Sequence, residues 1–133
     1  MVQTIVMEKT LQNNNSSSNY NQKLGKDGED IAKKLLLEKG FTFIDSNFSC
    51  NLGEIDLIFS HRITIIFVEV KTRTSNHLGN PEEAITKGKL SHLRKAAQFF
   101  LLKNPQYKNF QPRIDVVAID LATKDVRHYE AVY

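Results

Sequence analysis

The chain has 133 residues, of which 41% are hydrophobic and 25% are charged, and this size and composition predict one globular domain with a single core. No apolar run approaches the roughly 20 residues of a membrane span, and the N-terminus lacks the pattern of a signal peptide, so we expect a cytoplasmic protein. The single cysteine, Cys50, excludes an internal disulfide and is interpreted as a small buried or half-buried residue. The net charge of +3 lies in residues 23–133 and permits a polyanionic partner without requiring one.

Residues 1–22 are predicted to form a disordered polar tail. The stretch Leu11 to Gln22 reads LQNNNSSSNYNQ, which is rich in Asn and Ser and has no periodicity. Such a segment cannot bury enough apolar surface to offset the entropy lost on ordering. We therefore place the domain at residues 23–133 and expect the tail to be dispensable for folding.

One helix and three strands are predicted in the first half of the domain. Apolar residues recur at helical spacing from Leu24 to Lys39, and Gly40 supplies a C-terminal stop. Runs of β-forming residues then predict three consecutive strands, FTFIDSNF, EIDLIF and RITIIFVEVK. The short polar link Ser60-His61-Arg62 indicates that the last two strands form a hairpin.

A second helix follows the loop TSNHLGN. Asn80 can cap this helix, Pro81 suits the first helical position, and Glu83 completes a capping box. Apolar residues continue the helical period to Lys103, and Gly88 is a point at which the helix can break in two.

Two further strands, RIDVVAIDL and VRHYEAV, follow the second helix and are separated by a predicted turn. The complete order is α-β-β-β-α-β-β, without an internal repeat. This order predicts an α/β fold in which helices from the long connections cover a sheet.

Three charged side chains, Asp56, Glu69 and Lys71, lie inside the most apolar strands. A buried, unpaired charge costs several kcal/mol, so each of them requires a compensating partner. Alternate residues of a strand share a face, and Glu69 and Lys71 are therefore neighbours on one face.

The register of the predicted hairpin decides where Asp56 lies. A turn at His61-Arg62 that sets Ser60 opposite Ile63 would place Asp56 opposite Phe67. Its side chain would then share the face of Glu69 and lie diagonal to it, whereas a slip by one residue would separate the two acids.

The converging acids have two interpretations. Two carboxylates repel each other unless a cation lies between them, and hard oxygen ligands suit Mg²⁺ or Mn²⁺, which favours metal-assisted phosphodiester hydrolysis. The other interpretation is an ion pair between Glu69 and Lys71 on a partly exposed strand end, with Asp56 hydrogen-bonded to a turn. A short motif alone favours this second interpretation.

Five ordered blocks of the sequence resemble the YraN-like family of small bacterial proteins. They read GKDGEDIAKKLLLEKGF, NLGEIDLIF, IIFVEVKTR, GNPEEAITKGKLSHLRKAAQFFL and RIDVVAID, within about residues 23–130. This family is similar to the PD-(D/E)xK nuclease superfamily and to archaeal Holliday-junction resolvases. The resemblance implies a restriction-endonuclease-like fold, a central mixed sheet flanked by helices. Ile55 replaces the proline that usually precedes the motif aspartate, which is a common departure.

The resemblance also implies roles for individual residues. Asp56 matches the motif aspartate, Glu69 the motif acid and Lys71 the motif lysine, while Glu29 matches an acid that resolvase-like members place on the first helix. Asp56 and Glu69 are expected to bind Mg²⁺ or Mn²⁺, with the backbone carbonyl of Val70 as a further ligand. Glu29 is expected to add a direct or water-mediated contact.

Basic residues form a candidate nucleic-acid-binding band: Arg73, Lys87, Lys89, Arg94 and Lys95, together with Lys103. A solvated helix face explains most of them equally well. Lys89 is the strongest candidate, because it matches the lysine of the family's PEEA helix block and is expected near the site.

Other polar residues have both structural and functional interpretations. Glu54 would share the face of Asp56, but it also suits a turn. Arg113 and Asp115 match a family block, and an ion pair bracing a strand is as good an explanation as function. The histidines His61, His77, His92 and His128 lack metal-ligand spacing and are interpreted as surface or loop residues.

Two functional hypotheses follow. The first is a Mg²⁺-dependent endonuclease acting on branched or structured DNA, with a substrate implied only by the resemblance. The second is a non-catalytic nucleic-acid-binding accessory protein in DNA repair, recombination or uptake. The intact set Glu29, Asp56, Glu69 and Lys71 favours the first, and the similarity to resolvases favours a homodimer.

Overall fold

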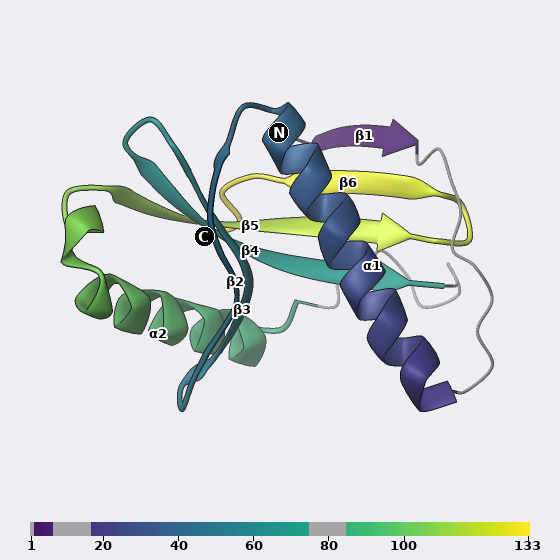
Figure 1. The fold of residues 1–133 in the computed structure, drawn as a ribbon, viewed down its shortest axis with the longest axis horizontal. Coiled ribbons are helices and arrows are strands. Elements are labelled where there is room, and N and C mark those ends of the chain that lie inside the picture. Colours follow the sequence, from purple (N-terminus) through teal and green to yellow (C-terminus); the bar gives the residue numbers. More distant parts are fainter. Residues whose placement is uncertain (1, 7–16, 75–84) are drawn as a thin grey trace.

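The computed structural model describes residues 2–6, 17–74 and 85–133, which form one sheet with a helix on each face (Figure 1). The elements are β1 (Val2–Val6), α1 (Ser17–Glu38), β2 (Thr42–Cys50), β3 (Gly53–His61), β4 (Thr64–Arg73), α2 (Lys87–Lys103), the short 3-10 helix η3 (Pro105–Tyr107), β5 (Gln111–Asp120) and β6 (Asp125–Tyr129). The predicted order α-β-β-β-α-β-β is confirmed, and β1 is an additional strand before it.

The sheet has the strand order β1-β6-β5-β4-β3-β2 and is mixed. The central pair β4–β5 is parallel, and the other neighbours are antiparallel. Its central strand β4 is buried on both faces from Ile65 to Val68, which explains the unbroken apolar run in its sequence. This α/β arrangement is consistent with the restriction-endonuclease-like fold that the sequence predicted.

Two apolar cores hold the layers together. On one face, Ala32, Leu35 and Leu36 of α1 pack against β3, β4 and β5. On the other face, Leu93, Ala96, Ala97 and Phe100 of α2 pack against residues that include Ile65 and Phe67 of β4. In Figure 1, α1 crosses one face of the sheet, and α2 lies on the opposite side of the sheet.

The N-terminal part differs from the predicted disordered tail. Val2–Val6 form β1, which pairs with β6 from Val2↔Tyr129 to Val6↔Asp125, and α1 begins at Ser17 instead of Leu24. The prediction of disorder is therefore wrong for these two stretches, while residues 7–16 lie outside the described residues. The β-branched sequence VQTIV favours a strand, and pairing supplies partners for the backbone groups of β6.

The β3–β4 hairpin forms as predicted but in a different register. Ser60 pairs with Ile65 and His61 with Thr64, so the predicted pairing of Ser60 with Ile63 is wrong by two residues. A shift by two keeps every side chain on its predicted face, because strand faces alternate with a period of two. Asp56 consequently moves along the hairpin from a position opposite Phe67 to one beyond the end of the ladder, which stops at Leu57↔Val68.

The ends of the helices follow local chemistry. Gly40 has φ +88 and the N–H of Phe41 donates to the carbonyl oxygen of Leu36, so the predicted stop of α1 is confirmed. Helix α2 begins at Lys87, where the Thr86 hydroxyl accepts a hydrogen bond from the Lys89 N–H at 3.1 Å. Gly88 lies within this helix and does not break it, and the cap expected at Asn80 lies outside the described residues.

Candidate active site

The predicted acids gather where the β3–β4 ladder ends. A cavity of about 390 Å³ is lined there by Glu29 of α1, Asp56 of β3, and Glu69, Val70 and Lys71 of β4. Helix α1 and the two strands of the β3–β4 hairpin thus supply the four residues predicted to be catalytic. The structure brings all four together around one space.

Asp56 is bound to the neighbouring strand through its side chain. Its carboxylate accepts a hydrogen bond from the Val70 N–H at 2.8 Å, and both residues lie beyond Leu57↔Val68, the last backbone pair of the ladder. Burial raises the pKa of Asp56, although this hydrogen bond and the charge of Lys89 oppose the shift. Asp56 is therefore fixed in position while its ionised form remains costly.

Glu69 is the most buried acid of the site, with 3% of its surface exposed. Its Oε1 atom lies 3.5 Å from the Lys71 Nζ and 3.4 Å from the Lys89 Nζ. Its Oε2 atom is buried and has no hydrogen-bond partner among the residues that the structure describes. Burial, followed by the negative charge of Asp56, raises the pKa of Glu69 to about 7. The two lysines therefore offset the burial of this carboxylate only in part.

Glu29 reaches the site because α1 approaches β4 closely. A Cβ atom at Gly28 would clash with the Thr72 hydroxyl, so glycine permits this approach one residue before Glu29. Burial raises the pKa of Glu29, and the negative charge of Asp56 acts in the same direction. Glu29 is thus electrostatically linked to the acids of the sheet.

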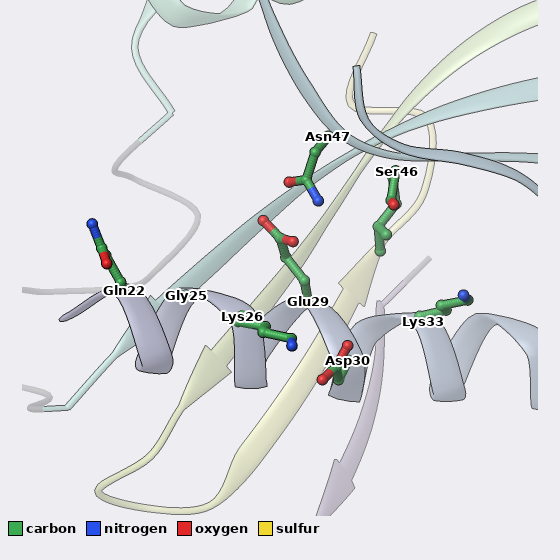
Figure 2. A pocket seen from close by; sticks show the side chains of 9 residues that line it. Gln22, Gly25, Lys26, Glu29, Asp30, Lys33, Ser46 and Asn47 are labelled. Atoms are coloured by element: carbon green, nitrogen blue, oxygen red, sulfur yellow. The ribbon is translucent and has the colours of Figure 1, made fainter. Parts of the chain in front are cut away.

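Asn47 is a site residue that sequence reasoning missed. It has φ +53, in the left-handed region that asparagine tolerates better than most residues. With its amide nitrogen turned toward Glu29, it donates to both carboxylate oxygens, at 3.2 and 3.3 Å. Figure 2 shows Glu29 pointing from α1 toward Asn47 on β2. No local sequence pattern revealed this contact, since the two residues belong to different elements.

The donor set suits a hard divalent cation. Asp56 and Glu69 supply carboxylate oxygens, and the backbone of Val70 lies beside them. In the described part of the chain, the Oε2 of Glu69 lacks a hydrogen-bond partner. Among residues 2–6, 17–74 and 85–133, no group of three or more His, Cys, Asp and Glu side chains stands ready to hold a metal. The residues therefore fit an ion that keeps several waters, as Mg²⁺ does, rather than one enclosed by side chains.

The predicted basic band divides into separate environments. Lys89 reaches Glu69, as expected, whereas the Arg94 guanidinium lies 4.1 Å from the ring centroid of Tyr133. Lys87 and Lys95 are exposed on α2, and Arg73 is half-buried at the end of β4. Lys103 lies 5.5 Å from the ring centroid of Phe99. Lys89 is the member of the band whose ammonium contacts a site carboxylate.

A second polar cluster lies away from the cavity, and it corrects the interpretation of His128. This histidine is fully buried on β6, and its Nε2 atom lies 2.8 Å from Asp115. Alternation along β6 places Val126 and His128 on one inward face, and this pattern could have predicted its burial. Arg113 donates two hydrogen bonds to Asp115, each at 2.9 Å, so the strand-bracing interpretation of this pair is confirmed.

The remaining residues considered in the sequence analysis differ in their burial and in their neighbours. Cys50 is half-buried, as expected, and packs against the core beneath α2. Glu54 and His92 are exposed, and His61 is half-buried beside the ring of Phe41, with the centroids 5.0 Å apart. His77 lies outside the described residues.

The fold and the paired acids define an α/β protein of restriction-endonuclease-like architecture. The chain matches the family model described as "Uncharacterised protein family UPF0102" over residues 28–119, and it belongs to this family. The resemblance to the YraN-like family is thereby confirmed. The matched region contains Glu29, Asp56, Glu69, Lys71 and Lys89.

Relatives in several bacteria carry the same family name. The chain is 42% identical to a UPF0102 protein of Caldanaerobacter subterraneus subsp. tengcongensis over 98 residues, which is 74% of this chain and 80% of that protein. It is 41% identical to one of Caldicellulosiruptor saccharolyticus over 104 residues, 78% of this chain and 87% of that protein. A Vibrio parahaemolyticus relative is 38% identical over 105 residues, covering 79% and 87% of the two chains. These names state no activity. No helix among the described residues combines the length and apolar character needed to cross a membrane.

Proposed function

We propose that this protein is a metal-dependent endonuclease that hydrolyses phosphodiester bonds of nucleic acid, with branched or structured DNA as the substrate implied by the resemblance. The observation that carries the proposal is the Oε2 atom of Glu69, which is buried beside a second carboxylate and has no hydrogen-bond partner within residues 2–6, 17–74 and 85–133. A buried acceptor without a donor destabilises the fold. A divalent cation at this position would satisfy it.

Asp56 and Glu69 would hold Mg²⁺ or Mn²⁺, together with the carbonyl oxygen of Val70. Glu29, on the opposite wall of the cavity, would contact the ion directly or through water. When bound, the ion would neutralise charge on the scissile phosphate and lower the pKa of an attacking water.

Two lysines supply positive charge at the same place. The Lys71 and Lys89 side chains are 29% and 40% exposed, so their ammonium groups can meet a substrate at the mouth of the cavity. There they would stabilise the negative charge that develops on the phosphate. Glu29 can accept a hydrogen bond from a water in the cavity and so orient it.

The accessory-protein hypothesis is supported by a different observation. Lys71 and Lys89 already offset the charge of Glu69 at Oε1, so the cluster also makes sense as a structural ion-pair network. In this alternative the protein binds nucleic acid in DNA repair, recombination or uptake without cleaving it. A nucleic-acid partner and a cytoplasmic site of action belong to both proposals, and a homodimer stays a prediction.

Cleavage and metal binding, measured on the same variants, separate the two proposals. The panel contains single-stranded, duplex, flap and four-way-junction substrates with Mg²⁺ or Mn²⁺, and calorimetry with Mn²⁺ measures metal uptake. Asp56→Asn should abolish metal uptake and cleavage while leaving nucleic-acid binding intact or tighter, because it removes negative charge from a site that meets phosphates. Lys71→Ala should keep metal uptake and lower turnover by roughly 10²- to 10³-fold.

The exposed Lys34 of α1 provides a matched control, because it lines neither this cavity nor the neighbouring one. Lys34→Ala should therefore leave metal uptake and turnover unchanged. Unchanged metal uptake in Asp56→Asn, or no cleavage of any substrate by wild type, would remove the nuclease proposal and leave the accessory protein. Unchanged turnover in Lys71→Ala would remove the role given to Lys71.

A further inference from the structure

A second cavity, of about 470 Å³, lies beside the candidate active site, between α1 and β2 (Figure 2). Lys26 and Lys33 of α1 line it on one side, and Ser46 and Asn47 of β2 line it on the other. Glu29 lines both this cavity and the one that contains Asp56 and Glu69. The two spaces are therefore adjacent, with Gly25 and Glu29 between them.

The walls of this second cavity carry the groups that recognise a nucleotide. The Lys33 ammonium lies 3.8 Å from the ring centroid of Phe43, which restrains its position by a cation–π interaction. Lys26 is exposed, so its ammonium can turn toward a ligand. The Ser46 hydroxyl and the Asn47 amide add hydrogen-bonding groups, which suit a sugar or a base edge.

The negative charges of the acids that line the cavity do not cancel the positive charges of Lys26 and Lys33. Glu29 is engaged by the Asn47 amide when that amide is turned toward it, and Asp30 is exposed to solvent, where salt screens its charge.

The backbone of β2 places Asn47 in line with the acids. Ser46 pairs with Leu57 and Phe48 with Ile55, so Asn47 occupies the intervening position, beside Asp56. Asn47 has a left-handed backbone, which asparagine adopts more readily than most residues other than glycine. A polar row thus crosses three strands: Asn47 on β2, Asp56 on β3 and Glu69 on β4. Glu69 lies just beyond the end of the β3–β4 ladder.

We propose that the second cavity binds the nucleic-acid strand that runs past Asp56 and Glu69, with Lys26 and Lys33 each contacting a backbone phosphate and Ser46 and Asn47 meeting the adjoining sugar or base. This inference rests on the proposed nucleic-acid substrate. Contacts to phosphates fix the position of a strand without reading its sequence, so this cavity would set which bond faces the acids.

The test measures the salt dependence of binding in EDTA, where no cleavage intervenes. Fluorescence anisotropy follows labelled single-stranded, duplex and four-way-junction oligonucleotides bound to wild type, Lys26→Ala, Lys33→Met and the double variant. Each lost phosphate contact should reduce the slope of log K against log salt by about 1, and the double variant should lose about 2. Met keeps the aliphatic packing of residue 33 over Phe43.

Two controls separate a phosphate contact from a general loss of charge or fold. Lys34→Ala removes the same charge from the exposed side of the same helix and should leave the slope unchanged. Lys26→Arg keeps the charge and should retain the wild-type slope. Thermal melting of each variant verifies that the fold is intact.

The outcomes distinguish this inference from the proposed function. If Lys26→Ala and Lys33→Met change the slope no more than Lys34→Ala does, the cavity is not a binding subsite, even when wild type cleaves DNA. If they reduce the slope and no substrate is cleaved with Mg²⁺ or Mn²⁺, the subsite stands and the nuclease proposal falls. If wild type binds none of the oligonucleotides, both are overturned.

Discussion

Two buried carboxylates, Glu69 and Asp115, lie at neighbouring levels of adjacent strands but in opposite environments. Glu69 of β4 pairs with Val116 of β5, the residue that follows Asp115. Asp115 is fully buried and receives hydrogen bonds from Arg113, from His128 and from the Ala131 N–H. Glu69 has two lysines near one carboxylate oxygen, and its other oxygen has no hydrogen-bond partner in the described stretches of the chain.

The pKa values of the two acids shift in opposite directions for this reason. Burial alone would raise the pKa of Asp115, but its hydrogen bonds from His128, Arg113 and Ala131 outweigh burial and lower it. The pKa of Glu69 rises to about 7, because burial and the charge of Asp56 outweigh its lysines. A satisfied carboxylate stabilises the fold, whereas an unsatisfied one retains the capacity to bind a cation.

The cluster around Asp115 extends to the end of α1. The Lys39 Nζ lies 2.7 Å from the His128 Nδ1, an arrangement in which Lys39 donates to Nδ1 and the Nε2–H donates to Asp115. Burial lowers the pKa of Lys39, although the negative charges of Glu130 and Asp115 oppose this shift. The network thereby ties α1, β5 and β6 together, and it holds the helix that carries Glu29.

The largest expected effect is the loss of this network. Asp115→Ala removes one partner of a buried ion pair and leaves Arg113 and His128 without their acceptor, so it should lower the free energy of unfolding by about 3–5 kcal/mol. Urea denaturation measures this loss. Asp120→Ala is the control, since Asp120 accepts two backbone hydrogen bonds in an exposed turn, and it should cost about 1 kcal/mol. Equal losses in the two variants would contradict the structural role of Asp115.

Glu69→Gln should have the opposite effect on stability, and the effect should depend on pH. The folded-state pKa of Glu69 is about 7 against an ordinary value of 4.5, so the folded state binds more protons between these values and its stability falls as pH rises. Glutamine does not titrate. The variant should therefore match wild type below pH 4.5 and exceed it above pH 7 by up to about 3 kcal/mol.

Urea denaturation of wild type and Glu69→Gln across this pH range tests that expectation. Mn²⁺ should reduce the difference in unfolding free energy between Glu69→Gln and wild type above pH 7, because an ion that binds only the folded wild type stabilises it. Glu54→Gln changes an exposed acid of the same region and serves as the control. A gap that does not vary with pH would show that burial of Glu69 imposes no cost.

The sequence predicted part of the difference between the sites of Glu69 and Asp115, because its strongest signals come from residues that are close together in the chain. The period of two in β4 placed Glu69 and Lys71 together, and it tolerated a register error of two residues. The motif blocks pointed to Glu29 and Lys89, whose contacts with the sheet no periodicity could reveal.

The features that the sequence did not predict depend on distant partners. β1 gains its stability from pairing with β6 at the far end of the chain. The hydrogen bonds of His128 depend on Asp115 and on Lys39, which is 89 residues away. Asparagine tolerates a left-handed backbone, but the run DSN does not show which of its residues adopts one inside a strand.

The smallest expected effect concerns Asn47. Its amide is the side-chain donor described for the Glu29 carboxylate, whereas the Asp115 carboxylate accepts hydrogen bonds from a guanidinium, an imidazole and a backbone N–H. Asn47→Gly removes the amide but allows φ +53, whereas Asn47→Ala removes it and strains the backbone. The two variants should therefore differ in unfolding free energy by roughly 1–2 kcal/mol, with glycine the more stable. Both should raise the pKa of Glu29 further, since burial already raises it and the hydrogen bond from Asn47 opposes that shift. Urea denaturation measures the first difference, and NMR titration of the Glu29 carboxyl measures the second. If the Glu29 pKa rises in neither variant, Asn47 affects only the backbone of β2. Glu29 would then differ from Asp115 in receiving no hydrogen bond from a neighbouring strand.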